Sequence, residues 1–240
     1  MKARLLLKKI WKWTKRIFIF LFFFHLFFII LFKWVNPPVT ITQLVSWISG
    51  DGLKRDYIHR NKISENAKLA VIAAEDQLFP DHSGFDWKNI KKAMAYNKKK
   101  PNRTRGASTI SQQVAKNVFL WQGRSWIRKG LEAYFTFMIE LIWGKKRILE
   151  VYLNVIEMGK GIYGIEAASR SYFNKPAASL TKAEAATIAS CLRNPKIYTV
   201  KPLSNSVAGR RQWVIQQMNN LESDPEIQKI IKGQFPKSKK

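Results

Sequence analysis

Residues 17–32 form a run of apolar and aromatic residues that only His25 interrupts, and this run limits the possible folds more than any other feature. A helix over these residues is about 24 Å long, slightly short of a bilayer core of about 30 Å. Tryptophans flank the run on both sides and can extend it as interfacial anchors. The sequence therefore predicts a basic tail over 1–16 and a transmembrane helix over 17–35.

The charges around this segment predict its orientation. Residues 1–16 include seven Lys or Arg and no acidic residue. The positive-inside rule then places the N-terminus in the cytoplasm and residues 36–240 outside. A cleaved signal peptide is the alternative, but no small-residue cleavage site follows the run. We therefore expect an uncleaved, single-pass anchor.

The chain is strongly basic, with 42 Lys and Arg against 16 Asp and Glu and a net charge of +26. Eight of the basic residues precede residue 36, so the remaining 34 basic and 16 acidic residues still give +18 outside the membrane. Nucleic acid, anionic lipid and phosphorylated substrates are the usual partners of such a charge. Because an external domain meets no genomic DNA, lipid headgroups and a phosphate-bearing substrate are favoured over nucleic acid.

The external part is predicted to be mostly helical. Asn36-Pro37-Pro38 opens a linker or membrane-proximal segment over 36–64, and the main domain spans 65–225. Capping boxes predict helix starts at Thr109 and at Thr181. Residues 226–240 are polar and rich in lysine, and we expect a frayed tail there.

Residues 127–143 form a second, shorter apolar run with two interpretations. The first is a core helix of an α domain. The second is a helix whose apolar face enters the outer leaflet of the membrane, which the neighbouring anchor makes more plausible.

Three other sequence features are interpreted as structural. Gly159 to Gly164 matches the dinucleotide-binding pattern, but it follows a helical segment rather than a strand. Ser179 to Lys182 matches the Ser-x-x-Lys of acylases without their other motifs. Cys191, the single cysteine, excludes an intrachain disulfide and is expected to be buried. No pair of the three histidines has zinc-ligand spacing.

Glu75 is the most informative acidic residue of the external part. It follows an apolar segment and begins a twelve-residue stretch with four carboxylates and one histidine. Partial burial at the end of a helix would raise its pKa toward the range of a general base. Alone, Glu75 and Glu150 would each be interpreted as surface residues. Together with the polar segment 106–109 and clustered cations they suit glycosyl transfer from a pyrophosphate. These cations are Lys116, Arg124, Arg128 and Lys129.

Five short motifs follow one another between residues 75 and 168. They read Glu75-Asp76-x-x-Phe79-x-x-His82-x-Gly84, Gly106-Ala107-Ser108-Thr109-Ile110-Ser111-Gln112-Gln113-Val114-Ala115-Lys116-Asn117, Arg128-Lys129-x-x-Glu132, Ile148-Leu149-Glu150-x-Tyr152-Leu153-Asn154 and Gly161-x-Tyr163-Gly164-x-x-x-Ala168. In this order they resemble the motifs of the peptidoglycan glycosyltransferases of family 51. The resemblance extends over roughly residues 55–200. The second motif usually begins with two glycines, and here the second is Ala107.

The resemblance implies a mainly α, lysozyme-like, two-lobed glycosyltransferase domain with one N-terminal transmembrane helix. It also implies that lipid II, the undecaprenyl-pyrophosphoryl disaccharide-peptide, is polymerised into peptidoglycan strands with inversion and release of undecaprenyl pyrophosphate. By this resemblance Glu75 is the general base, and Glu150 assists the leaving group or holds a divalent cation. Lys116 and Arg124 match pyrophosphate-binding positions. The other substrate-binding positions implied are Asp76, Phe79, His82, Gly84, Ser108, Thr109, Gln112, Gln113, Asn117, Arg128, Lys129 and Glu132.

The resemblance carries further expectations about cofactors, partners and location. It implies a divalent cation, Mg²⁺ or Mn²⁺, whose ligands the sequence does not identify, and no organic cofactor. Expected partners are lipid II, the growing glycan strand and membrane lipid, with penicillin-binding proteins and division proteins as further candidates. A single anchor without a second catalytic domain resembles the monofunctional members, which implies a bacterial inner membrane with the catalytic domain in the periplasm.

Two rival functions follow from the same features. A lytic transglycosylase or lysozyme would share a related fold and a catalytic glutamate, but it needs no cations for a pyrophosphate. A membrane scaffold without enzymatic activity would explain the anchor and the charge, but not five ordered motifs.

Overall fold

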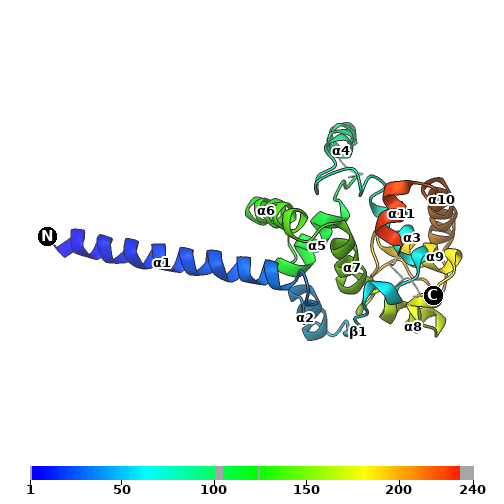
Figure 1. Cartoon of the computed structure of the whole chain (residues 1–240), viewed down its shortest axis with the longest axis horizontal. Coiled ribbons are helices and arrows are strands. Elements are labelled where there is room, and N and C mark those ends of the chain that lie inside the picture. The colour runs from blue at the N-terminus through cyan, green and yellow to red at the C-terminus, as the bar shows by residue number, and fades with distance from the viewer. Residues whose placement is uncertain (1, 101–104, 124, 233–240) are drawn as a thin grey trace, which may run out of the picture. The chain divides into compact units, whose positions relative to one another are not determined.

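The computed structural model describes residues 2–100, 105–123 and 125–232, and it divides the chain into two compact units. The first unit, residues 1–36, is the long helix α1 (Lys2–Leu31) with the turn that follows it (Figure 1). Within α1, Leu6–Leu31 is long and apolar enough to cross a membrane by length and composition. This span begins earlier than the apolar run because a helix continues through the basic tail.

The second unit, residues 37–240, is mainly helical, as predicted. Its helices are α2 (Ile41–Ile48), η1 (Arg60–Lys62), α3 (Glu65–Glu75), α4 (Trp87–Lys99), α5 (Ile110–Phe119), α6 (Trp126–Ile142), α7 (Lys145–Val155), α8 (Ile165–Phe173), η2 (Ala177–Ser179), α9 (Lys182–Cys191), α10 (Asn205–Leu221) and α11 (Pro225–Ile231). Three short strands, β1 (Lys54–Arg55), β2 (Glu157–Gly159) and β3 (Ile162–Tyr163), form a sheet in the order β1-β3-β2. Strand β3 pairs parallel to β1 and antiparallel to β2.

The helices of this unit pack in two groups (Figure 1). Helix α3 packs against α9, α10 and α11, whereas α5 packs against α6 and α7. Residues 67–73 of α3 and 185–191 of α9 are all buried, and both helices are rich in alanine. Because consecutive residues over two turns are buried on every side of each helix, this pair forms the centre of its group.

Local capping chemistry fixes several helix starts. The predicted capping boxes at Thr109 and Thr181 are both present, with Gln112 and Glu184 as their reciprocal partners. A third capping box joins Thr40 to Gln43 at the start of α2. In each box a hydroxyl and a longer polar side chain satisfy backbone N–H groups that a helix start leaves without partners.

The segment over 36–64, predicted as a linker or membrane-proximal segment, contains α2, β1 and η1 and from residue 37 is part of the second unit. The amide of Asn154 in α7 accepts a hydrogen bond from the Ile58 N–H at 2.9 Å and donates one to the Ile58 carbonyl at 3.0 Å. This pairing fixes the segment against a buried helix. No local pattern signals it, because the two residues lie far apart in sequence.

The C-terminal segment is also more ordered than predicted as far as residue 232. Helix α11 begins after Asp224, whose carboxylate accepts hydrogen bonds from the Glu226 and Ile227 N–H groups. Ile227 and Ile231 are buried where α11 meets α3 and α7. The burial of these two isoleucines, one turn apart, therefore holds α11 in place, although the polar composition of this segment predicts a frayed tail.

Helix α6, which covers most of the second apolar run, has one buried and one exposed apolar side. Phe135 and Ile139 are buried on the side that packs against α5. Other apolar side chains of α6 are open to the surroundings, and Trp126 is 92% exposed. The exposed set also includes Ile127, Phe137 and Leu141. The helix is therefore part of the core on one side and presents an uncovered apolar face on the other.

Candidate active site

Glu75 is the last residue of α3, and its carboxylate emerges from a helix that otherwise lies in the interior. Its side chain is only 12% exposed. Burial raises the pKa of the Glu75 carboxyl above its ordinary value, because the charged form loses solvation. A carboxylate with a raised pKa is a stronger proton acceptor near neutral pH.

Gln113 of α5 connects Glu75 to the interior. Its Nε2 donates to Glu75 Oε2 at 2.9 Å, and its Oε1 accepts from the Tyr152 hydroxyl at 3.3 Å. Tyr152 of α7 is completely buried, so it gives the amide a fixed partner. On the other carboxylate oxygen, Arg210 Nη2 of α10 lies 3.9 Å away. Glu75 is thus held from two sides by elements distant in sequence.

Asp76 and His82 bond to each other inside the protein. His82 Nε2 lies 2.9 Å from Asp76 Oδ1, and Asp76 Oδ2 accepts from the Ile110 N–H at 3.0 Å. The Gly84 N–H donates to His82 Nδ1, so that nitrogen is an acceptor and the ring proton is on Nε2. Both side chains, predicted to bind substrate, tie the loop after α3 to the start of α5.

Two further residues of the first motif shape this loop. Phe79 is completely buried, and the Lys145 ammonium lies 4.6 Å from its ring centroid. Gly84 has φ of +88°, and a Cβ there would lie 2.7 Å from Thr136 Cγ2. Only glycine fits this position without displacing its neighbour. The structure therefore places these residues in the framework beneath Glu75.

The polar residues of the second motif divide into two groups. Ser108, Thr109 and Gln113 line a cleft beside Glu75. In contrast, the Gln112 side chain is buried, and its Oε1 accepts from the Thr109 N–H. The Asn117 side chain is also occupied, since it donates to the Gln113 carbonyl and lies 3.4 Å from the Thr42 hydroxyl of α2.

The cleft beside Glu75 has a volume of about 1110 Å³. Its lining comes from the end of α3, from α4, from the segment 105–109, and from α5 and α10. Two arginines in the lining, Arg193 and Arg210, were not among the predicted site residues. No motif spacing in the sequence points to either arginine, and both come late in the chain. Only their closeness in space to Glu75 identifies them.

A cluster of cations surrounds Glu132 on α6. Arg128 Nη1 lies 2.9 Å from one Glu132 carboxylate oxygen, and the Lys129 ammonium bonds to the other. Burial lowers the pKa of the Lys116 ammonium of α5, and the charges of this cluster also act on it. Among the described residues, no carboxylate lies within 4.0 Å of Lys116 Nζ. Arg124, predicted to act with Lys116, lies outside the described residues.

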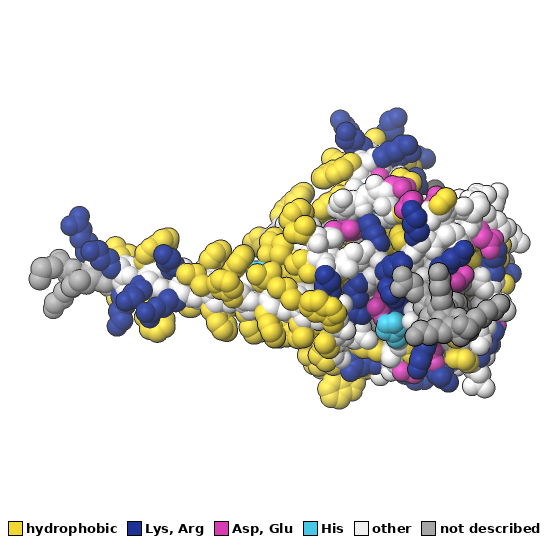
Figure 2. Space-filling model, viewed as in Figure 1, with side chains coloured by type: hydrophobic (Ala, Val, Ile, Leu, Met, Phe, Trp, Pro, Cys, Tyr) yellow, Lys and Arg dark blue, Asp and Glu magenta, His cyan; other side chains and the backbone are white. Residues whose placement is uncertain are grey.

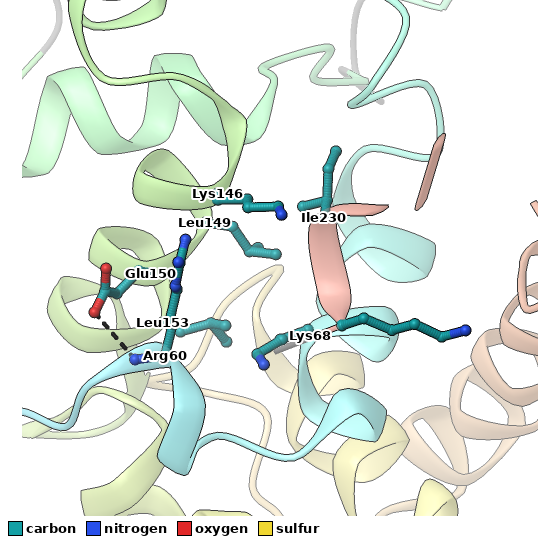
Figure 3. Close-up of a pocket in the computed structure, with 8 residues that line it drawn as sticks. Arg60, Lys68, Lys146, Leu149, Glu150, Leu153 and Ile230 are labelled. Atoms are coloured by element: carbon teal, nitrogen blue, oxygen red, sulfur yellow. Dashed lines mark hydrogen bonds between the residues drawn. The ribbon is translucent and has the colours of Figure 1, made fainter. Parts of the chain in front are cut away.

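Glu150 does not line the cleft that contains Glu75. Its Oε1 accepts from the Arg60 N–H at 3.0 Å, and its Oε2 lies 3.0 Å from Arg147 Nη1. Figure 3 shows it beside a separate small pocket lined by Lys68, Lys146 and Ile230. The structure thus separates the two predicted catalytic carboxylates and gives Glu150 bonds that join α7 to η1.

The described residues do not form a protein cage for the expected divalent cation. They include no group of three His, Cys, Asp or Glu side chains that could hold a metal. Asp76, the carboxylate next to Glu75, already bonds to His82 and to Ile110. Mg²⁺ commonly binds through one or two carboxylates and substrate phosphates, so an ion here would need phosphate oxygens for most of its ligands.

Comparison with known proteins connects this geometry to a family. The model of the family described as Transglycosylase matches residues 42–219. A biosynthetic peptidoglycan transglycosylase of Yersinia pseudotuberculosis serotype O:3 (strain YPIII) is 48% identical over 222 residues, which cover 90% of this chain and 92% of the relative. A protein with the same name from Escherichia coli (strain ATCC 8739) is 51% identical over 78% of this chain and 78% of its own length. Another, from Mannheimia succiniciproducens, is 60% identical over 69% of this chain and 68% of its own length. The chain therefore belongs to the transglycosylase family, and it is a peptidoglycan glycosyltransferase.

Proposed function

We propose that the enzyme polymerises lipid II into glycan strands by inverting glycosyl transfer and releases undecaprenyl pyrophosphate. The observation that supports this most is the placement of Glu75, a largely buried carboxylate with a raised pKa at the edge of a large cleft. A group that accepts a proton near neutral pH is what activation of a sugar hydroxyl requires.

Glu75 takes the proton from the 4-hydroxyl of the acceptor sugar in this proposal. The oxygen then attacks the anomeric carbon of the growing strand from the face opposite the pyrophosphate. The new glycosidic bond forms as the bond to the pyrophosphate oxygen breaks, so the configuration changes from α to β. The hydrogen bond from Gln113 keeps one carboxylate oxygen fixed, and in this proposal the other, 3.9 Å from Arg210 Nη2, faces the acceptor.

Lys116 is assigned to the departing pyrophosphate, together with Arg124. Its support is an ammonium that is mostly removed from solvent with no carboxylate bound to it among the described residues. Burial of an unpaired charge is unfavourable, and a bound anion would offset that cost. Arg128 and Lys129 add positive charge nearby, and Glu132 holds both in place. Glu132 is therefore the second acidic residue of the site in this proposal, and Glu150 is assigned a structural role.

Attachment to the membrane completes the proposal. Helix α1 acts as the single-pass anchor of an inner membrane, with the basic N-terminus inside and the second unit in the periplasm. The exposed apolar face of α6 enters the outer leaflet. Because the lipid II tail stays in the bilayer, an anchored enzyme meets its substrate at a raised effective concentration.

The test uses the full chain in detergent with labelled lipid II and either Mg²⁺ or Mn²⁺. We expect a ladder of long glycan from the wild type and a loss of about 10²- to 10⁴-fold in rate for Glu75→Gln, the usual contribution of a general base. Glu65→Gln, at the exposed other end of α3, is the matched control and should polymerise normally. Cleavage of preformed glycan without polymerisation would favour a lytic enzyme instead.

A further inference from the structure

Helix α4 forms a strongly basic wall of the cleft that the proposed chemistry does not use. Of its residues only Ala93 is buried, and Figure 2 shows a cluster of Lys and Arg side chains at this edge of the second unit. Lys88 and Lys92, one turn apart, line the cleft, and Arg105 joins them from the following segment. In the ranges that the structure describes, none of these three forms an ion pair with a carboxylate within 4.0 Å.

Asp86, the nearest acidic residue in sequence, also lines the cleft but forms no ion pair with Lys88 or Lys92 within 4.0 Å in the described ranges. Asp86 is the N-cap of α4, and its two oxygens accept from the backbone and the side chain of Asn89 at 2.8 Å and 2.6 Å. Because both lysines are exposed, line the cleft and have no carboxylate partner in the described ranges, they can bind an anion there. Their spacing along the helix axis, about 6 Å, separates the two charges.

The size of the cleft allows it to hold more than the reacting sugars. Sites for drug-sized ligands have volumes of about 300–1,000 Å³, and this cleft has about 1110 Å³. The proposed substrate carries a peptide on its disaccharide, and the carboxylates of such a peptide are spaced along an extended chain. Exposed lysines that lie apart suit carboxylates that also lie apart along a peptide. A compact pyrophosphate instead needs cations that converge on one place, as Arg128 and Lys129 do around Glu132.

We propose that Lys88 and Lys92, with Arg105, bind the carboxylates of the peptide that the substrate carries, and so favour acidic over neutral peptides in the cleft. This inference rests on the proposed function, because it names a further part of the same substrate. Helix α4 then contributes to the choice of peptide on the acceptor or on the growing strand. The sugar chemistry at Glu75 stays independent of it.

The experiment compares two lipid II substrates, one with free peptide carboxylates and one with the same carboxylates converted to amides. The variants are Lys88→Gln/Lys92→Gln and, as a matched control, Lys91→Gln/Lys98→Gln. All four lysines are exposed on α4, but Lys91 and Lys98 do not line the cleft. Both double variants remove the same charge from the same helix, and circular dichroism checks that each folds.

We expect the wild type and the control to have a lower KM for the acidic substrate. The cleft variant should lose this preference through a roughly threefold to tenfold rise in KM for the acidic substrate alone, since exposed ion pairs are individually weak. Its kcat should stay unchanged. Equal KM values for both substrates with the wild type would overturn the inference while leaving the proposed function intact. An equal effect of both double variants would instead indicate general attraction to an anionic membrane, and it would also overturn the inference.

Absence of any polymer from the wild type would mean failure of the proposed function itself. Binding of a water-soluble muramyl peptide, measured by titration calorimetry on the same full-length variants, then decides the inference separately. Weaker binding to the Lys88→Gln/Lys92→Gln variant than to the control supports the site. Equal binding to both, or none to the wild type, contradicts it.

Discussion

The side chain of Gln113 donates a hydrogen bond of 2.9 Å to Glu75, and the buried Tyr152 hydroxyl donates to the same amide at 3.3 Å. Tyr152 thereby fixes which end of the amide faces the carboxylate. Burial raises the pKa of Glu75, and the Gln113 hydrogen bond counteracts part of this rise because it stabilises the charged form. Burial therefore sets the direction of the shift, and the Gln113 amide, whose orientation Tyr152 fixes, limits its size.

Replacement of Gln113 by methionine should move the pH profile of polymerisation. Loss of the donor raises the pKa of Glu75 further, so the acidic limb of kcat/KM should shift to higher pH. Tyr152→Phe, which keeps the amide but frees its orientation, should shift the limb in the same direction by a smaller amount. A lower rate with an unchanged profile would show that Gln113 only supports the fold.

The same burial predicts that Glu75→Gln stabilises the protein near neutral pH. The raised pKa means that ionisation of Glu75 is less favourable in the folded chain than in the unfolded chain. Its destabilising effect is absent below the unfolded value of about 4.5, grows as the pH rises through the raised folded pKa, and is complete above it.

Thermal unfolding across this range measures the effect. Glu75→Gln should have a higher Tm than the wild type at pH 7 and the same Tm below pH of about 4.5. Glu65→Gln, in the first turn of the same helix, should lose about 0.3–1 kcal/mol of favourable interaction with the helix N-terminus. A Tm that rises for Glu75→Gln and falls for Glu65→Gln would distinguish a functional carboxylate from a structural one. A lower Tm for Glu75→Gln at pH 7 would contradict the prediction.

Local chemistry explains which parts of the fold could be predicted. Each capping box lies within four residues, and the apolar run over 17–32 carries its own signal, so these elements follow from short stretches of sequence. Helix α11 was missed although Asp224 caps its start, because the burial of Ile227 and Ile231 against other helices depends on contacts that the local sequence does not show.

The site was harder to predict because long-range contacts decide it. Sequence spacing places Glu150 in a motif. In the structure, however, one of its carboxylate oxygens accepts a hydrogen bond from the Arg60 N–H, 90 residues away. Asp76 and His82 also belong to a motif, yet each is occupied by its neighbours. Conversely, Arg210 reaches Glu75 from a helix with no motif. A motif shows that residues are needed together, but it does not say which of them contact the substrate.

Lys116→Gln should weaken the enzyme while stabilising the fold. Burial lowers the pKa of Lys116, so its charged form is destabilising in the folded chain at every pH below its ordinary value of 10.5. Loss of a charge-assisted hydrogen bond to a phosphate corresponds to about 10- to 100-fold in kcat/KM. Lys229→Gln is the control, since this exposed lysine is likewise paired with a glutamate three residues away, Glu226, and does not line the cleft. Tm and kcat/KM that both fall for Lys116→Gln would argue for a purely structural lysine.

His82→Ala should reduce stability rather than substrate affinity. The change removes the Nε2 donor from the buried Asp76 carboxylate and the acceptor of the Gly84 N–H, and such losses cost about 1–3 kcal/mol. We expect the Tm to fall by several degrees, with KM for lipid II unchanged in the folded fraction. His59→Ala should cost less than His82→Ala, since this side chain is 60% exposed and its contacts are a cap of the short helix η1 and a 3.9 Å approach to Glu150. His82→Gln, which can both donate and accept, should recover part of the loss. A wild-type Tm with a raised KM for His82→Ala would instead restore the substrate-binding role that the sequence predicts.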